Sequence, residues 1–179
     1  MGRVLIATDG SELALAAAGH AVRLLGASHD YCLLAVVAAP ADLVAPGAAD
    51  MAAVGGVGAG GLGAAAVYGP EVLARQAEAL AEEARGVLER TAAVLPDDLH
   101  LERRVEHGDP GTVICRVADD DDVDVIAVGS HGAGFVRRLL LGSVSNHVLN
   151  QAPCPVLVLR ERDHGGAAGT AAGEPRSSE

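Results

Sequence analysis

The chain has 179 residues, with 24 acidic and 13 basic side chains and a net charge of −11, and every basic residue is an arginine. The absence of lysine excludes a Walker-type phosphate loop, which needs a lysine ammonium on the phosphates, and it excludes Schiff-base chemistry. A chain this acidic repels nucleic-acid backbones and anionic membranes, and its three aromatic residues offer no platform for stacked bases. Neither nucleic acid nor a membrane is an expected partner.

The apolar pattern predicts short strands that alternate with helices along the chain. In chain order we expect a strand at 3–8, a helix at 11–25, a strand at 31–37, a helix from Pro70 to Pro96, a strand at 99–106, a helix opening at Asp109-Pro110, a strand at 123–128, a helix at 143–151 and a strand at 156–159. Residues 4–7 and 123–128 are nearly all apolar, which is typical of central strands. The strand at 99–106 alternates apolar with charged residues, as an edge strand does.

This alternation predicts one α/β domain, a Rossmann-like, doubly wound five-stranded parallel sheet in the order 3-2-1-4-5 with helices on both faces. The domain covers residues 1–160, with a glycine- and alanine-rich insert at 40–69 that we expect to be a long loop. Residues 161–179 have little to bury, so we expect a disordered tail. Three cysteines without paired spacing, and no leader peptide, indicate a reduced cytoplasmic protein.

Two glycine turns are predicted to meet where the strand order reverses, which is where open α/β sheets bind ligands. Gly129 and Gly132 follow the strand at 123–128, and Gly142-Ser143 opens the next helix. Free backbone N–H groups at such a turn and helix start favour a phosphate, and the hydroxyls of Ser143 and Ser145 add donors. The same residues also fit ordinary loop glycines and a helix N-cap.

Two weaker patterns have simpler interpretations. The acidic run at 119–122 invites a cation site, but it precedes a strand and is better explained as a solvated loop. Residues 56–61 match G-x-G-x-x-G by letter alone, without the strand that a dinucleotide site requires. In the helix at 11–25 we expect one apolar face, made by Leu13, Ala17, Ala21, Leu24 and Leu25.

The spacing G-x2-G-x9-G-S, written by Gly129, Gly132, Gly142 and Ser143, resembles the nucleotide-binding signature of the universal stress protein family. The segments RVLIATDGSE, HGDP, VDVIAVGSHG and APCPVLVLR are similar to that family in the same order. The resemblance implies a cytoplasmic homodimer that binds ATP, with Mg²⁺ held mainly by the phosphates, in a regulatory role in the stress response. The apolar strand at 156–159 is the expected dimer edge.

The resemblance also implies which residues contact the nucleotide. The nucleoside, the adenine wall, the ribose and the phosphates would be held by Ala7, Thr8, Asp9, Val36, Val128, Gly129, Gly132, Gly142, Ser143, Val144 and Ser145. Arg137 and Arg138 are candidate phosphate cations or solvent-facing side chains, and His131 is a ligand contact or a backbone spacer. Two other functions remain open: a slow ATP hydrolase that uses Asp9 or His131, and an adaptor that binds no nucleotide. No catalytic or metal-ligating residue is assigned.

Overall fold

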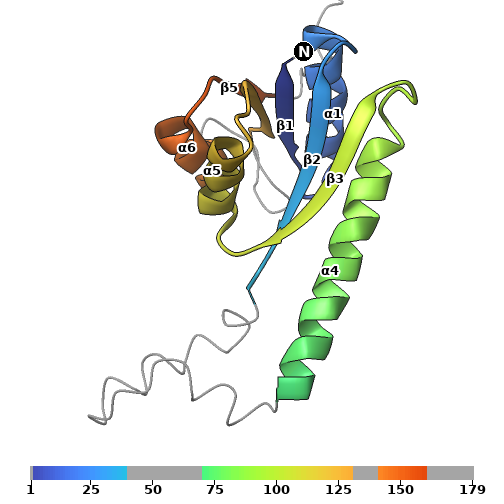
Figure 1. Cartoon of the computed structure of the whole chain (residues 1–179), viewed down its shortest axis with the longest axis vertical. Coiled ribbons are helices and arrows are strands. Elements are labelled where there is room, and N and C mark those ends of the chain that lie inside the picture. Colours follow the sequence, from blue (N-terminus) through green and yellow to red (C-terminus); the bar gives the residue numbers. More distant parts are fainter. Residues whose placement is uncertain (1, 40–69, 131–140, 161–179) are drawn as a thin grey trace, which may run out of the picture.

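The computed structural model describes residues 2–39, 70–130 and 141–160, in which strands and helices alternate along the chain (Figure 1). The elements are β1 (Arg3–Ala7), α1 (Glu12–Leu25), β2 (Asp30–Val37), α4 (Pro70–Ala92), β3 (His100–His107), α5 (Pro110–Asp120), β4 (Val125–Gly129), α6 (Ser143–Gln151) and β5 (Val156–Leu159). Every predicted element is present, with ends shifted by a few residues. The predicted loop at 40–69 and tail at 161–179 lie outside the described residues and stay predictions.

The five strands form one parallel sheet in the order β3-β2-β1-β4-β5, which confirms the predicted order. Leu5 in β1 is paired with Cys32 of β2 on one side and with Ile126 of β4 on the other. All carboxyl ends therefore lie at the same edge of the sheet, and the order reverses between β1 and β4. The charged strand β3 and the apolar strand β5 form the two outer edges.

Two helices cover each face of the sheet, because the side chains of each strand alternate between the two faces. Ile6 and Leu33 pack on one side with α1 and α4. Leu5 and Leu34 pack on the other side with α5 and α6. Each fully buried leucine or isoleucine contributes about 1.5–3 kcal/mol relative to an exposed one, so the central strands supply much of the stability.

The buried face of α1 matches the expected one at Ala17 and Ala21 and differs from it at Leu24. Leu24 is 67% exposed. The residues that α1 buries are instead small ones, Ala14, Ala17, Ala18, Ala21 and Val22. Their spacing of three and four still forms one helical face, and small side chains let the helix lie close to the sheet. The prediction of an inward Leu24 was wrong because the buried alanine face, which Ala14 and Ala18 complete, turns Leu24 to solvent.

The three cysteines are free thiols, as expected. Burial raises the pKa of the Cys32 thiol to about 11 and also raises the pKa of Cys115 and Cys154. Thiols that hold their protons at neutral pH are poor nucleophiles. Within the described residues, no helix is long and apolar enough to cross a membrane.

Candidate functional site

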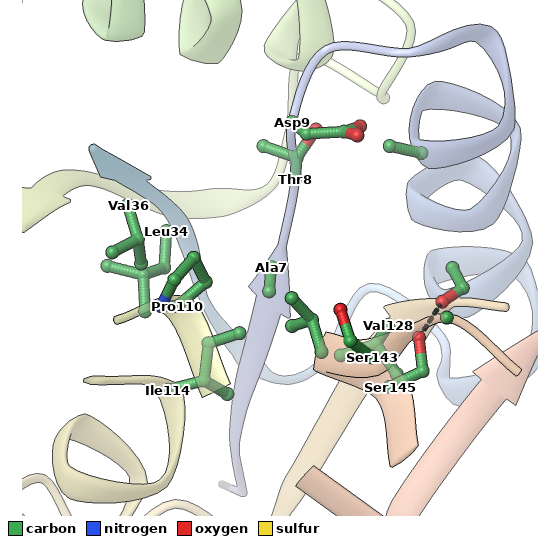
Figure 2. A pocket seen from close by; sticks show the side chains of 14 residues that line it. Ala7, Thr8, Asp9, Leu34, Val36, Pro110, Ile114, Val128, Ser143 and Ser145 are labelled. Carbon is green, nitrogen blue, oxygen red and sulfur yellow. Dashed lines mark hydrogen bonds between the residues drawn. The ribbon is translucent and has the colours of Figure 1, made fainter. Parts of the chain in front are cut away.

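A cavity of about 270 Å³ opens beyond the carboxyl ends of β1 and β4, where the strand order reverses (Figure 2). It lies between these strand ends and the first turns of α5 and α6. Ten of the eleven predicted site residues line it: Ala7, Thr8, Asp9, Val36, Val128, Gly129, Gly142, Ser143, Val144 and Ser145. The eleventh, Gly132, lies outside the described residues, as do His131, Arg137 and Arg138. That the ten contact a ligand stays a prediction.

The turn from β1 to α1 forms one wall of the cavity and is held by its own side chains. Oδ1 of Asp9 accepts hydrogen bonds from the backbone N–H of Ser11 at 3.0 Å and from its hydroxyl at 2.6 Å. Ser11 also caps α1, because its Oγ accepts from the N–H of Ala14. Gly10 turns the chain with φ +75°, a conformation that favours glycine. The Asp9 carboxylate is thereby held at the cavity.

The start of α6 is fastened to the end of β4. The hydroxyl of Ser145 donates to the carbonyl of Gly129 at 2.6 Å, as Figure 2 shows. The N–H of Gly142 donates to the carbonyl of Ser130 at 2.9 Å. Ser145 gives its proton to Gly129 in this structure, and the expectation that its hydroxyl donates to a ligand stays a prediction. Its backbone N–H is not affected.

The first turn of α6 presents uncapped N–H groups to the cavity. Gly142 occupies the N-cap position and offers no side-chain acceptor, and the first bond within the helix comes from the N–H of Asn146. Among the described residues, no acceptor receives the N–H groups of Ser143, Val144 or Ser145. These groups and the positive end of the helix dipole make this turn suited to an anion.

The first turn of the neighbouring helix α5 is capped, unlike that of α6. Oδ1 of Asp109 accepts from the backbone N–H of Thr112 at 2.9 Å and from its hydroxyl at 2.7 Å. These bonds, the backbone one first, lower the pKa of Asp109, because they favour the charged carboxylate. Pro110 follows at the first helical position and has no N–H to offer. The start of α5 is therefore less suited to an anion than the start of α6.

An apolar wall completes the cavity on the side of β2 and α5, and β4 and α1 add one apolar residue each. Val36 and Val128 were predicted, and the sequence interpretation missed four further residues: Ala14, Leu34, Pro110 and Ile114. Leu34 lies two residues before Val36 and so on the same face of β2, which a strict reading of strand alternation would have found. Pro110 and Ile114 belong to the helix that follows the HGDP segment. Their place in the wall depends on how α5 packs across the sheet.

Charge is nearly absent from the described part of the cavity lining, where Asp9 is the one ionisable side chain. The charged groups gather elsewhere, along β3 and α5. Ion pairs of 2.7–3.1 Å connect Glu102, Arg3, Asp121, Arg104, Glu106, Arg116 and Asp120 in that order. The acidic run at 119–122 is thus not a solvated loop throughout, because the Asp121 side chain is only 19% exposed between two arginines. The described residues contain no group of three potential metal ligands.

The model of the universal stress protein family matches residues 1–160. The chain belongs to the universal stress protein family. This confirms the resemblance that the glycine spacing indicated. The match covers every strand and helix that the structure describes.

Several family members are similar to the chain in sequence. The universal stress protein Slr1101 of Synechocystis is 35% identical over 94 residues, which are 52% of this chain and 87% of that protein. The universal stress protein MJ0577 of Methanocaldococcus jannaschii is 34% identical over 85 residues, or 47% of this chain. That match spans about half of MJ0577, 52% of its length.

Solved structures of the family share the fold. The structure of MJ0577 superposes with a TM-score of 0.63 at 25% identity and covers 90% of this chain and 97% of that one. A family member from Arabidopsis thaliana, solved with AMP bound, gives a TM-score of 0.55 at 18% identity over 91% of this chain and 94% of that one. The doubly wound architecture is therefore the common fold of these proteins.

Proposed function

We propose that this universal stress protein binds ATP in the cavity between β1, β4, α5 and α6, and that nucleotide binding gives it a regulatory role in the stress response. The observation that carries the proposal is the uncapped first turn of α6 opposite an apolar wall. A nucleotide has one anionic end and one flat, weakly polar end, and the cavity offers a matching surface for each. Family members solved with AMP and with cAMP support this ligand class.

The base and the phosphates are expected on opposite sides of the cavity. Leu34, Val36 and Ile114 would lie against the adenine, since the described lining contains no aromatic ring to stack on it. The N–H groups at the start of α6 would hold the phosphates. Ala7, Thr8 and Asp9 lie between these two regions, where the ribose would be bound.

Mg²⁺ would be carried mainly by the phosphates. Magnesium retains several waters and usually takes one or two carboxylates from a protein, and Asp9 is the one carboxylate in the described lining. The predicted roles of Gly132 in the phosphate turn, and of Arg137 and Arg138 as phosphate cations, remain part of the proposal.

A regulatory function fits the described lining better than a catalytic one. Hydrolysis needs a base that can accept a proton from water. Asp9 is the one ionisable group that the described residues place in the lining, and its Oδ1 already accepts two hydrogen bonds from Ser11. Occupancy of the site, rather than turnover, is therefore the proposed signal.

Calorimetric titration of the full chain with ATP and Mg²⁺ tests the proposal, together with mass spectrometry of the denatured protein for nucleotide retained from expression. We expect one ATP per chain and negligible release of phosphate over the same period. Absence of binding at millimolar ATP would overturn the proposal and favour an adaptor. Steady phosphate release that is lost in Asp9→Ala would favour the slow hydrolase instead.

We propose in addition a homodimer through β5, in the cytoplasm, where free thiols are stable. The two sheet edges differ. β3 presents a run of charged residues at its edge, whereas β5 consists of Val156–Leu159 and has no charge. Charged edges resist pairing and apolar ones favour it. Sedimentation is expected to give twice the chain mass of 17.9 kDa for the wild type and the monomer mass for Val158→Lys. A monomeric wild type would contradict the dimer.

A further inference from the structure

A buried hydroxyl of α4 lies against the carboxyl end of β1. Thr91 is 0% exposed and Thr8 is 7% exposed, and their Oγ1 atoms are 3.1 Å apart. Thr8 lines the cavity, whereas no residue of α4 belongs to the described lining. Buried hydroxyls are kept only where they are hydrogen-bonded. The pair therefore connects α4 to the site from outside it.

The contact between the two threonines allows either hydroxyl to donate, and the bond from Thr91 to Val87 decides between them. The hydroxyl of Thr91 donates its single proton to the carbonyl of Val87 at 2.9 Å, so the proton between the two threonines comes from Thr8. Oγ1 of Thr8 in turn accepts from the N–H of Gly10 at 3.2 Å. Three bonds thus form a relay from Gly10 through Thr8 and Thr91 to Val87, and each polarises the next.

The two ends of this relay also touch each other. A Cβ atom on Gly10 would lie 2.9 Å and 3.0 Å from the two methyl groups of Val87. Gly10 has φ +75°, so glycine is required there both for its backbone conformation and for the space. The turn that follows Thr8 is therefore fixed on α4 by packing and by the relay together.

We propose that Thr91 is a positioning residue of the nucleotide site, which holds the Asp9-Gly10 turn at the cavity through the hydroxyl of Thr8. This inference rests on the proposed function. Asp9 directly follows Thr8, and its Oδ1 is bonded to Ser11 at the start of α1. A shift of Thr8 would therefore move the carboxylate at the cavity. Helix α4 thereby helps to position the site, although none of its residues belongs to the described lining.

The substitution Thr91→Val tests the proposal, because valine keeps the shape of threonine and removes both the donor and the acceptor. Two readouts are measured on the full chain: ATP affinity by calorimetry, and hydrogen exchange of the Gly10 amide without ATP. We expect affinity to fall about tenfold and exchange to rise about tenfold, the effect of one to two lost hydrogen bonds. Thr91→Ser should return both to within about twofold of the wild type.

Two controls separate positioning from general destabilisation. Leu88→Ala lies one turn earlier on the same helix, is equally buried and has no part in the relay, so it should lower stability and leave both readouts near wild type. In a Thr8→Val background, adding Thr91→Val should change affinity by less than about twofold, because the connection is already broken. If Thr91→Val does not fold, Thr91→Cys, with a weaker donor and acceptor, should give intermediate effects.

The outcomes distinguish this inference from the proposed function. Wild-type affinity and wild-type Gly10 exchange in Thr91→Val would overturn the positioning role and leave ATP binding intact. An equal loss of affinity in Leu88→Ala would also overturn it. If the wild type binds no ATP, the proposed function fails, and the role of Thr91 in ligand binding fails with it. The Gly10 exchange then still shows whether Thr91 holds the turn.

Discussion

The starts of α5 and α6 lie side by side at the same end of the sheet and line the same cavity, yet they offer opposite chemistry. The helices approach closely, since a Cβ on Gly111 would lie 2.7 Å from Cγ of His147. Asp109 and Pro110 close α5, whereas Gly142 leaves α6 open. A helix start therefore becomes a phosphate site only where the chain leaves its N–H groups uncapped. The capped start of α5 contributes apolar surface to the same cavity.

The largest expected effect on ATP affinity comes from adding a side-chain cap to the first turn of α6. In Gly142→Asp a carboxylate occupies the N-cap, where it would accept from the first-turn N–H groups and repel phosphate. Gly142 has φ −59° and ψ 157°, which suits any residue, so the fold should be retained. We expect calorimetry to show about a hundredfold loss of ATP affinity, the effect of lost charge-assisted bonds and added repulsion.

The matched control adds the same charge at the far end of the same helix. Asn150→Asp lies about 12 Å along α6 from Gly142, at 1.5 Å per residue. Its ATP affinity should stay within about threefold of the wild type. Equal losses in the two variants would mean that net charge, and not the open helix start, controls binding.

A smaller effect is expected from the apolar wall. Val36→Asp places a carboxylate where the adenine would lie, and an unpaired polar group against an apolar partner should lower ATP affinity about tenfold to thirtyfold. Val94→Asp is the control, because this valine is 51% exposed and outside the cavity lining. Retained affinity in Val36→Asp would contradict the assignment of the base to this side.

Removing the cap of α5 should change the free energy of unfolding more than it changes ATP affinity. Asp109→Ala removes the cap, and we expect the free energy of unfolding to fall by about 1 kcal/mol at pH 7 in denaturant titrations. ATP affinity should change by less than about threefold, because the proposal puts the base, and not the phosphates, on the α5 side. A large gain in affinity would show that a second open helix start also binds phosphate.

The smallest effect is the pH dependence of that cap. Since the folded pKa of Asp109 is lowered, its ionised form stabilises the protein above the unfolded pKa of about 3.9. This contribution is lost as the pH falls through the folded pKa. The stability difference between wild type and Asp109→Ala should therefore be constant above about pH 6 and shrink below about pH 4. Asp109→Asn should keep most of the cap, without this titration.

Much of the fold could be predicted because its signals are local. The apolar runs and helix limits fixed the order of the elements, and α6 begins and ends at the predicted residues. The place of the site follows from the strand order, since the reversal between β1 and β4 brings Asp9 and Gly129 to one cavity.

The parts that escaped prediction depend on contacts between distant segments. Asp121 is held by Arg3 and Arg104, a pairing that requires the register of β1, β2 and β3 and the packing of α5. Ile114 reaches the cavity because of the rotation of α5 about its axis. The relay through Thr91 joins residues 83 positions apart in the chain. No periodicity or local spacing encodes such contacts.

The most direct test of the central claim is an NMR titration of the ¹⁵N-labelled full chain with ATP and Mg²⁺, with the amides of both helix starts followed together. The account predicts large, saturable shifts for Ser143, Val144 and Ser145, whose N–H groups are uncapped. It predicts a much smaller shift for Thr112, whose N–H already donates to Asp109. Unchanged signals at 143–145, or larger shifts at Thr112 than at α6, would contradict it.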